Sequence, residues 1–324
     1  MKAARFVGPR RIELIEVEKP EMEAGKALVR MERAAICGSE MPFFLGQRPI
    51  PYPLAPGAPG HECVGVVEDS ECAGVSPGDR VLAFPSGPGG LQECLLLGSA
   101  NLLTLPDGHP PEILLMTQLL GTVVHCWRKL DNLIGQDVVI VGQGPVGLLF
   151  TAMTRYAGAR RIIVTDLLDY RLETAKRMGA TDVVNADRTD VTAAVREVTR
   201  GRMADMAIEA VGRRSTIHQC MDLVPRGGTV VFFGIPDKDT TSDDTFPFEF
   251  VKFFRKELRL IASVGPDPVA DHGLALALIA QDRIDVSPLI THRVSFSDIQ
   301  RGYEMAATKE DDPIKIIIDF DRAA

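Results

Sequence analysis

The stretch that most constrains the fold is an apolar run followed at once by a glycine-rich turn, at positions 137–150. Residues 138–141 are continuously apolar, as is typical of a parallel strand buried on both faces. Gly142, Gly144 and Gly147 then form the pattern G-x-G-x-x-G. The first glycine permits a tight turn, the second lets the backbone approach a pyrophosphate, and the third lets helix and strand pack closely. The stretch predicts a strand, a turn and a helix whose free N–H groups face the phosphates of a dinucleotide.

A second apolar run ends on an acidic residue at the spacing expected for such a site. Residues 161–166 are predicted to form the next strand, and Asp166 lies 19 residues beyond Gly147. A carboxylate at this position binds the ribose hydroxyls of the adenosine and repels a 2′-phosphate, so NAD is favoured over NADP. The alternative is that Asp166 caps a helix, although Asp169 is the better placed of the two for that role.

The chain of 324 residues is too long for one ordinary hydrophobic core, so we expect two domains. Beyond residue 136, apolar runs alternate with helical patterns, which indicates an α/β domain with a doubly wound parallel sheet. The predicted strands of this sheet are 138–141, 161–166, 182–185, 206–212, 228–234 and 258–264. Residues 1–100 instead carry short strand-like runs between turns rich in Pro and Gly, which favours a small barrel or sandwich.

Residues 265–324 break the alternation of strand and helix. We expect a helix at 270–281, a second helix opened by a capping box of Ser297 and Gln300, and a final strand at 314–320. A separate third domain of this size is disfavoured. The segment is therefore predicted to return to the β-rich first domain and complete it.

Net charge, hydropathy and cysteine content indicate which partners and which cellular compartment to expect. The formal net charge is −8 and no basic face can be traced along the chain, which argues against nucleic acid. No apolar run reaches the roughly 18 residues of a membrane-spanning helix, and the amino terminus lacks the apolar region of a signal peptide. We therefore expect a cytoplasmic protein without a membrane partner. The six cysteines form no C-x-x-C pair and are expected to be reduced thiols.

Two short segments of the first domain contain residue types that bind metals. Cys37-Gly-Ser-Glu40 supplies a thiol and a carboxylate, and Gly60-His-Glu62 supplies an imidazole and a second carboxylate. Thiolate, imidazole and carboxylate are all ligands of zinc. Each residue type is more often structural when it stands alone, so the two segments by themselves leave both interpretations open.

Together with motifs along the whole chain, these segments resemble the medium-chain dehydrogenase/reductase family, in its zinc-dependent alcohol and polyol dehydrogenase branch. The matching pieces, in family order, are Cys37–Glu40, Gly57–Glu62, Gly78–Val81, Gly89-Gly90, the glycine turn, Asp166, Glu209–Gly212, Gly227-Gly228, Gly234 and Ile290–His292. The resemblance implies a GroES-like catalytic domain made of residues 1–119 and 265–324. It also implies a Rossmann dinucleotide-binding domain at 120–264.

The resemblance implies a role for each residue of the two metal-binding segments. Cys37 and His61 match the first two ligands of a catalytic zinc, and Glu62 matches an acid that binds or approaches the metal. Glu40 matches the acid that supports the site from outside the ligand shell. Ser39 matches the hydroxyl that takes the substrate proton.

The resemblance also implies which residues bind the cofactor NAD. Thr122 matches a residue beneath the nicotinamide ring and Val146 a residue beside it. Arg171 matches a basic residue at the adenosine ribose, and Lys315 one near the pyrophosphate. The remaining expected contacts come from the turn and from the strand ends around it: Gly142, Gly144, Pro145, Gly147, Asp166, Val211 and Gly234.

The sequence departs from the family pattern at two places. The lobe of four cysteines that holds a structural zinc should follow Val81 and is missing, so no structural zinc is expected. The third catalytic ligand, usually Cys, Asp or Glu, is replaced by Gln118. We expect one catalytic zinc on Cys37, His61 and Glu62, with Gln118 or water completing the shell. His125 and Cys126 are alternative ligands, but such residues more commonly face a core.

The resemblance implies an NAD(H)-dependent oxidoreductase that interconverts an alcohol or polyol and its aldehyde or ketone by zinc-assisted hydride transfer. The main alternative is a metal-free reductase of quinones or enones on the same fold, which the missing third ligand favours. A nucleotide-binding protein without catalysis is a third possibility. A homodimer or homotetramer with a small-molecule substrate is expected from the family.

Overall fold

The computed structural model describes residues 1–85, 89–236, 245–268 and 270–320. Contacts within the chain divide it into two compact units. Unit 1 consists of Met1–Gly121, Asp267–Gln281 and Ile290–Ala324, and unit 2 consists of Thr122–Pro266 and Asp282–Leu289. The predicted domain limits lie within two residues of the main divisions. The exception is 282–289, which the sequence assigned to the first domain and which packs with unit 2.

Unit 2 contains a six-stranded sheet in which every neighbouring pair is parallel. The strand order is β10-β9-β8-β11-β12-β13, so the chain moves outward in one direction and then in the other from β8. The strands are β8 (Asp137–Val141), β9 (Arg161–Asp166), β10 (Asp182–Asn185), β11 (Met206–Glu209), β12 (Thr229–Phe232) and β13 (Arg259–Ala262). This is the doubly wound sheet that the sequence predicted, and the change of direction lies between β8 and β11.

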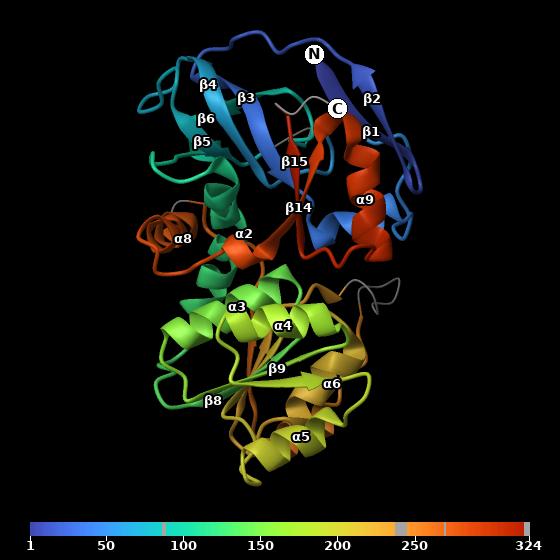
Figure 1. Cartoon of the computed structure of the whole chain (residues 1–324), viewed down its shortest axis with the longest axis vertical. Helices are drawn as coiled ribbons and strands as arrows, with labels where there is room; N and C mark the ends of the chain where they lie inside the picture. The colour runs from blue at the N-terminus through green and yellow to red at the C-terminus, as the bar shows by residue number, and fades with distance from the viewer. Residues whose placement is uncertain (86–88, 237–244, 269, 321–324) are drawn as a thin grey trace. The chain divides into compact units, whose positions relative to one another are not determined.

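Helices cover both faces of this sheet. In Figure 1, α3 (Pro145–Tyr156) and α4 (Asp169–Arg177) lie on one face, and α5 (Val191–Val198) and α6 (Arg214–Asp222) lie on the other. All five residues of β8 are buried, as a strand covered on both faces requires. The shorter helix α7 (Phe250–Lys256) precedes β13.

Unit 1 is built from a hairpin and a seven-stranded sheet. The hairpin pairs β1 (Lys2–Gly8) with β2 (Arg11–Glu16). The sheet order is β14-β15-β3-β4-β5-β7, with β6 paired to β3. Its strands are β3 (Lys26–Ala35), β4 (Cys63–Ser70), β5 (Arg80–Ala83), β6 (Cys94–Gly98), β7 (Leu102–Thr104), β14 (Ile290–Ser295) and β15 (Lys315–Asp319). Because β15 pairs with β3, the carboxyl-terminal segment completes the first domain as predicted.

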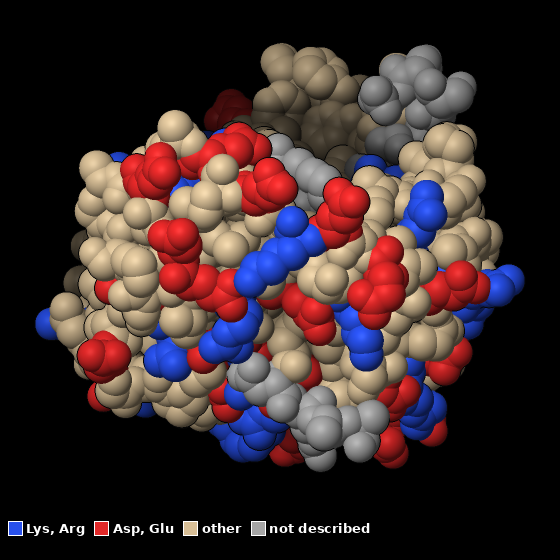
Figure 2. Space-filling model, turned by 90° about the horizontal axis from the view of Figure 1, so that it is seen from above, with Lys and Arg blue, Asp and Glu red and all other residues tan. Residues whose placement is uncertain are grey.

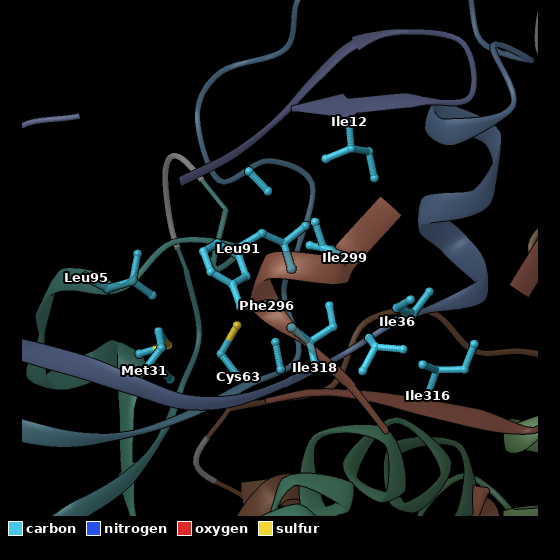
Figure 3. Close-up of a cluster of buried hydrophobic side chains, with 14 of the residues drawn as sticks. Ile12, Met31, Ile36, Cys63, Leu91, Leu95, Phe296, Ile299, Ile316 and Ile318 are labelled. Atoms are coloured by element: carbon cyan, nitrogen blue, oxygen red, sulfur yellow. The ribbon is translucent and has the colours of Figure 1, made fainter. Parts of the chain in front are cut away.

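The core of unit 1 is made by both ends of the chain (Figure 3). The side chains labelled in that view are Ile12, Met31, Ile36, Cys63, Leu91, Leu95, Phe296, Ile299, Ile316 and Ile318. Three of them are sequence neighbours of candidate site residues, since Ile36 precedes Cys37, Cys63 follows Glu62 and Ile316 follows Lys315. Burial of these apolar side chains therefore fixes the backbone on which the site is built.

Three helices complete unit 1 or cross its limit: α2 (Pro111–Trp127), α8 (Ala270–Ala280) and α9 (Ile299–Thr308). A four-residue helix, α1 (Met41–Phe44), follows the first candidate segment. The predicted capping box before α9 is wrong. The side chain of Gln300 accepts a hydrogen bond from Ile12 N at 2.8 Å and donates one to Arg10 O at 3.0 Å, so it binds the hairpin instead of the helix end.

The described surface carries charged side chains of both signs. On the face shown in Figure 2, acidic and basic side chains are interspersed and neither sign forms a continuous field. Among the residues that the structure describes, no helix is both long enough and apolar enough to span a bilayer.

Candidate active site

The pairing of two strands in unit 1 brings the metal-binding segments together. Ala34 of β3 lies opposite Cys63 of β4 in the antiparallel register. Cys37 follows the end of β3, while His61 and Glu62 immediately precede β4, so both segments emerge at the same edge of the sheet. Residues separated by more than twenty positions therefore share one location, which strand register explains.

Three potential ligands meet at this edge. The sulfur of Cys37, a ring nitrogen of His61 and a carboxylate oxygen of Glu62 all lie within 4.8 Å of one another. Within the described ranges, this is the group of three His, Cys, Asp or Glu side chains that can hold a metal ion. The cluster contains three of the four predicted ligands. The fourth, Gln118, lies half-buried on α2, where its backbone oxygen is 3.2 Å from His272 Nε2.

Glu40 lies behind the cluster and contacts both of its segments. Its carboxylate is buried, with Oε2 accepting a hydrogen bond from Cys37 N at 3.2 Å and Oε1 lying 3.0 Å from His61 Nδ1. The hydroxyl of Tyr303 donates to the same Oε2 at 2.6 Å. Sequence reasoning missed Tyr303, because nothing in its local pattern distinguishes it from other apolar residues of α9.

The charge of the cluster fits a bound cation. Burial opposes the charged form of His61, but hydrogen bonds to Cys37 and Glu40 and their negative charge outweigh this effect and raise the His61 pKa to about 11. The proton of His61 is thus held among negatively charged groups that accept its hydrogen bonds. Metal binding releases protons from such ligands, and a thiolate, an imidazole and a carboxylate are a suitable donor set for zinc.

Ser39 lies beside the sulfur of this cluster. Its Oγ donates a hydrogen bond to Cys37 Sγ at 3.3 Å, and the side chain is half-buried. With its hydrogen directed to sulfur, the hydroxyl oxygen keeps its lone pairs for a proton from another group.

Lys315 departs from its predicted position at the cofactor pyrophosphate. Its ammonium is buried inside unit 1, where Nζ lies 2.7 Å and 2.6 Å from the two oxygens of Glu62 and donates to Ile36 O at 3.2 Å. Burial alone lowers the Lys315 pKa, but the charges of Glu62 and Cys37 outweigh it and raise the pKa above its ordinary value. The structure therefore corrects the prediction, because this ammonium neutralises a carboxylate of the cluster and is not an accessible cation for phosphate.

The alternative ligands on α2 do not join the cluster. His125 and Cys126 belong to unit 2, and neither is part of a potential metal group among the residues that the structure describes. Cys126 is buried, and burial raises its pKa to about 11, which leaves a neutral thiol at physiological pH. Cys126 is therefore a small residue of the core, which is the commoner role of a buried cysteine.

The glycine turn of unit 2 has the geometry that its sequence requires. Gly142 adopts φ +92°, a conformation that other residues rarely adopt. A Cβ on Gly147 would lie 1.8 Å from Gly142 O, so only glycine lets α3 begin so close to β8. Gly144 is the N-cap of α3 and Pro145 its first residue, which leaves the helix N-terminus open toward the turn.

Asp166 ends β9 beside this turn. One carboxylate oxygen accepts from Gln143 N at 2.6 Å, and the other accepts from Leu168 N at 3.0 Å. Arg171 Nη1 lies 3.6 Å from the first oxygen. Neither acid caps α4, because its N-cap is Leu168 and Asp169 instead binds Arg188 and Asn185.

The loop after β11 lies next to the glycine turn, at the point where the strand order changes direction. Val211 Cγ2 would lie 2.5 Å from a Cβ on Gly142, so the two segments are in close contact. Glu209 holds this loop, since its buried carboxylate accepts from Val211 N at 3.0 Å and its backbone oxygen from Gly234 N at 3.0 Å. The predicted residues Val211 and Gly234 thus lie together with the turn at the carboxyl edge of the sheet. Thr122 and Val146 are half-buried in the same unit.

Comparison with known protein families finds one match largely within each of the two units of the chain. Residues 23–108 match the alcohol dehydrogenase GroES-like domain, and residues 145–281 match the zinc-binding dehydrogenase family. An L-threonine 3-dehydrogenase from Shewanella woodyi (strain ATCC 51908 / MS32) is 30% identical over 354 residues, covering 99% of this chain and 100% of that protein. The chain belongs to the zinc-type medium-chain dehydrogenase/reductase family. As a member of it, this dehydrogenase is an oxidoreductase that acts on a CH–OH group of a small molecule with a nicotinamide dinucleotide, NAD(P).

Solved structures of other dehydrogenases share the fold. Alcohol dehydrogenase TADH from Thermus sp. ATN1 is 27% identical to this dehydrogenase and superimposes with a TM-score of 0.88, covering 98% of this chain and 99% of that one. The 2R,3R-butanediol dehydrogenase from Bacillus subtilis is 24% identical with a TM-score of 0.85 and the same coverage. Both superpositions include the GroES-like and the Rossmann parts, which confirms the predicted fold class.

Proposed function

We propose that this dehydrogenase uses NAD(H) and one catalytic zinc to interconvert an alcohol or polyol and its aldehyde or ketone. The observation that carries the proposal is the convergence of Cys37, His61 and Glu62 within 4.8 Å of one another. Glu40 supports this group from behind, because it accepts a hydrogen bond from Cys37 N and lies close to His61 Nδ1, and Tyr303 in turn donates a hydrogen bond to Glu40. The ligands of a metal centre are oriented by outer hydrogen bonds of this kind, whereas isolated structural residues do not need them.

In the proposed site, Cys37, His61 and Glu62 hold the metal and Gln118 or water completes the shell. When bound, zinc supplies a Lewis acid that stabilises negative charge on an alcohol oxygen. Ser39, whose hydroxyl is oriented beside Cys37, would accept the proton that the alcohol loses as it passes its own hydroxyl proton on to water. Glu40 keeps the Nδ1 side of His61 engaged, so that Nε2 is the nitrogen available to the metal.

We also propose NAD as the preferred cofactor. The carboxylate of Asp166 is fixed by two backbone N–H groups at the end of β9, beside the glycine turn. A fixed negative charge at this point suits ribose hydroxyls and opposes a 2′-phosphate. Arg171 lies close enough to Asp166 to share that ribose site.

The names of the relatives support a proposal for the substrate class. Relatives matched over 99% of the chain include L-threonine 3-dehydrogenases, and threonine is a secondary alcohol with charged neighbouring groups. We propose a secondary alcohol that carries a polar group on the adjacent carbon. L-threonine, vicinal diols and sugar alcohols are therefore the first substrates to test.

Two further properties belong to the proposal. No structural zinc is proposed, because the sequence after Val81 has Cys94 as its one cysteine before Cys126. The alignment to the threonine dehydrogenases spans 354 positions against 324 residues here, which agrees with a deleted segment.

A homodimer or homotetramer is proposed from the family, and β13, at the end of the sheet order, offers an edge for pairing.

The test is zinc content together with turnover in protein purified without chelator. We expect about one zinc per chain, loss of that zinc in Cys37→Ser, and reduction of NAD by alcohols from the panel. NAD binding should survive the substitution, because the glycine turn lies in the other unit. A protein that binds no zinc after reconstitution, yet reduces quinones or enones, would instead support the metal-free reductase.

A further inference from the structure

One buried carboxylate connects three distant parts of unit 1. Glu40 is 1% exposed, and its oxygens contact Cys37 N, His61 Nδ1 and Tyr303 Oη at 3.2, 3.0 and 2.6 Å. Cys37 and His61 are candidate ligands, whereas Tyr303 lies on α9 and donates its hydrogen bond to Glu40. The shortest of the three contacts is therefore the one that leads away from the metal cluster.

The position of the Tyr303 ring is fixed by aromatic packing. The side chain is fully buried, with its ring edge-to-face against Phe6 at 5.1 Å and tilted against Phe44 at 5.5 Å between centroids. A phenylalanine would fill the same apolar space. A hydroxyl in such a place is unfavourable unless it has a hydrogen-bond partner, and that partner is Glu40.

We propose that Tyr303 is a positioning residue of the metal centre, and that its hydroxyl fixes the Glu40 carboxylate so that Cys37 and His61 face one ion. This inference rests on the proposed zinc site. A glutamate side chain has three rotatable bonds, so its carboxylate can occupy several places unless donors select one. Cys37 N donates to Oε2 at 3.2 Å, and the Tyr303 hydroxyl donates to the same oxygen at the shorter distance of 2.6 Å.

The chemistry of the tyrosine agrees with this role. Burial, with the charge of Glu40 beside it, raises the pKa of Tyr303 well above its usual value. The hydroxyl therefore stays protonated and remains a donor throughout the range in which an enzyme works. In a low-dielectric setting, a hydrogen bond to a carboxylate is stronger than one in water.

The test is the zinc affinity of the full chain, measured by competition with a chromogenic chelator. Outer-shell substitutions typically weaken metal binding 10- to 100-fold, and we expect Tyr303→Phe to bind zinc about 10-fold more weakly than wild type. The visible spectrum of the cobalt(II)-substituted protein should also change, because the ligand geometry relaxes. Tyr52→Phe is the matched control, since it removes a hydroxyl that donates to Phe43 O in the same unit. Its zinc affinity should equal that of wild type.

A double-mutant cycle with Glu40→Gln shows whether Tyr303 acts through Glu40. We expect Glu40→Gln alone to weaken zinc binding and the addition of Tyr303→Phe to weaken it no further. An affinity within twofold of wild type in Tyr303→Phe, or losses that multiply in the double variant, would overturn the inference while leaving the zinc site intact. A wild-type chain that binds no zinc would overturn the proposed mechanism and this inference with it.

Discussion

The ammonium of Lys315 lies 2.6 Å from Oε2 of Glu62, and both side chains are fully buried in unit 1. Lys315 starts β15 and Glu62 precedes β4, so the ion pair joins segments from opposite ends of the chain. The backbone oxygen of Ile36, the residue before Cys37, accepts a third contact from the ammonium. The cation therefore stabilises one candidate ligand and lies next to another.

Replacing Lys315 by methionine should strongly destabilise the protein. In the metal-free protein, the substitution removes the ammonium partner of the buried Glu62 carboxylate, and breaking a buried ion pair typically costs about 3–5 kcal/mol. Urea unfolding followed by circular dichroism would measure the loss. The double variant Lys315→Met, Glu62→Met is the control, because an apolar pair of similar volume should recover most of the stability. A single variant that loses less than about 1 kcal/mol would contradict the buried ion pair.

Alanine substitutions at two glycines of the turn should differ in their effects on stability and on NADH affinity. A Cβ on Gly147 would lie 1.8 Å from Gly142 O, so Gly147→Ala must move backbone and should lower both stability and NADH affinity. At Gly144 the nearest atom to a new Cβ is Arg171 Nη1 at 4.0 Å. Gly144→Ala should therefore fold normally and yet bind NADH at least about 10-fold more weakly, because the methyl group occupies the space of a pyrophosphate.

NADH fluorescence titration and the thermal unfolding midpoint separate the two effects. Equal affinity in Gly144→Ala and wild type would show that the dinucleotide does not approach this glycine. An unchanged midpoint in Gly147→Ala would show that the contact between Gly147 and Gly142 is looser than its geometry indicates.

Much of unit 2 could be predicted from the sequence because its signals are local. A strand buried on both faces has a continuous apolar run, and β8 and β9 lie where such runs were found. Strands β7 and β14 were not predicted. These two strands lie at the ends of the sheet order, where β15 and β5 offer them partners, and such tertiary pairing cannot be read from local sequence.

The candidate site was only partly predictable, since its residues are joined by tertiary contacts. Cys37, His61 and Glu62 could be found from their motifs, and strand register then explains their meeting. Tyr303 and the partner of Lys315 could not, because a contact between residues 253 positions apart leaves no trace in local spacing. Lys315 was placed at the pyrophosphate by resemblance alone, and burial beside Glu62 corrects that position.

Cofactor choice should depend on the charge of Asp166. Asp166→Asn keeps the size and one acceptor for Gln143 N, but it removes the charge that opposes a 2′-phosphate. We expect the ratio of kcat/KM for NAD over NADP to fall at least about 10-fold, or about 1.4 kcal/mol in transition-state free energy. Asp169→Asn is the matched control, because it removes the same charge from an exposed carboxylate bound to Arg188. A ratio that changes equally in both variants would assign the effect to general electrostatics.

A buried acid also lies at the amino end of β8, the end opposite to the glycine turn. Asp137 is fully buried and accepts from Arg160 Nε at 2.8 Å and from Arg202 Nη2 at 2.9 Å, with Arg161 Nη1 at 3.3 Å. Burial alone raises the Asp137 pKa, but the hydrogen bond from Arg160 and the three positive charges together lower it below its ordinary value. The ionised carboxylate thus stabilises the amino end of the central strand.

Asp137→Asn should lower the stability of unit 2 at pH 7 by on the order of 2 kcal/mol, through loss of charged hydrogen bonds. A carboxyl whose pKa is depressed on folding contributes stability above its unfolded pKa, about 3.9, and loses it as pH falls through the folded value. The difference between wild type and Asp137→Asn should therefore be constant from pH 7 to about pH 5 and shrink below about pH 4. Trp127, the single tryptophan, lies in unit 2 with its ring 6.5 Å from that of Phe150, so its fluorescence reports urea unfolding of this unit. A difference that stays constant down to pH 3 would show that the arginines do not depress the Asp137 pKa.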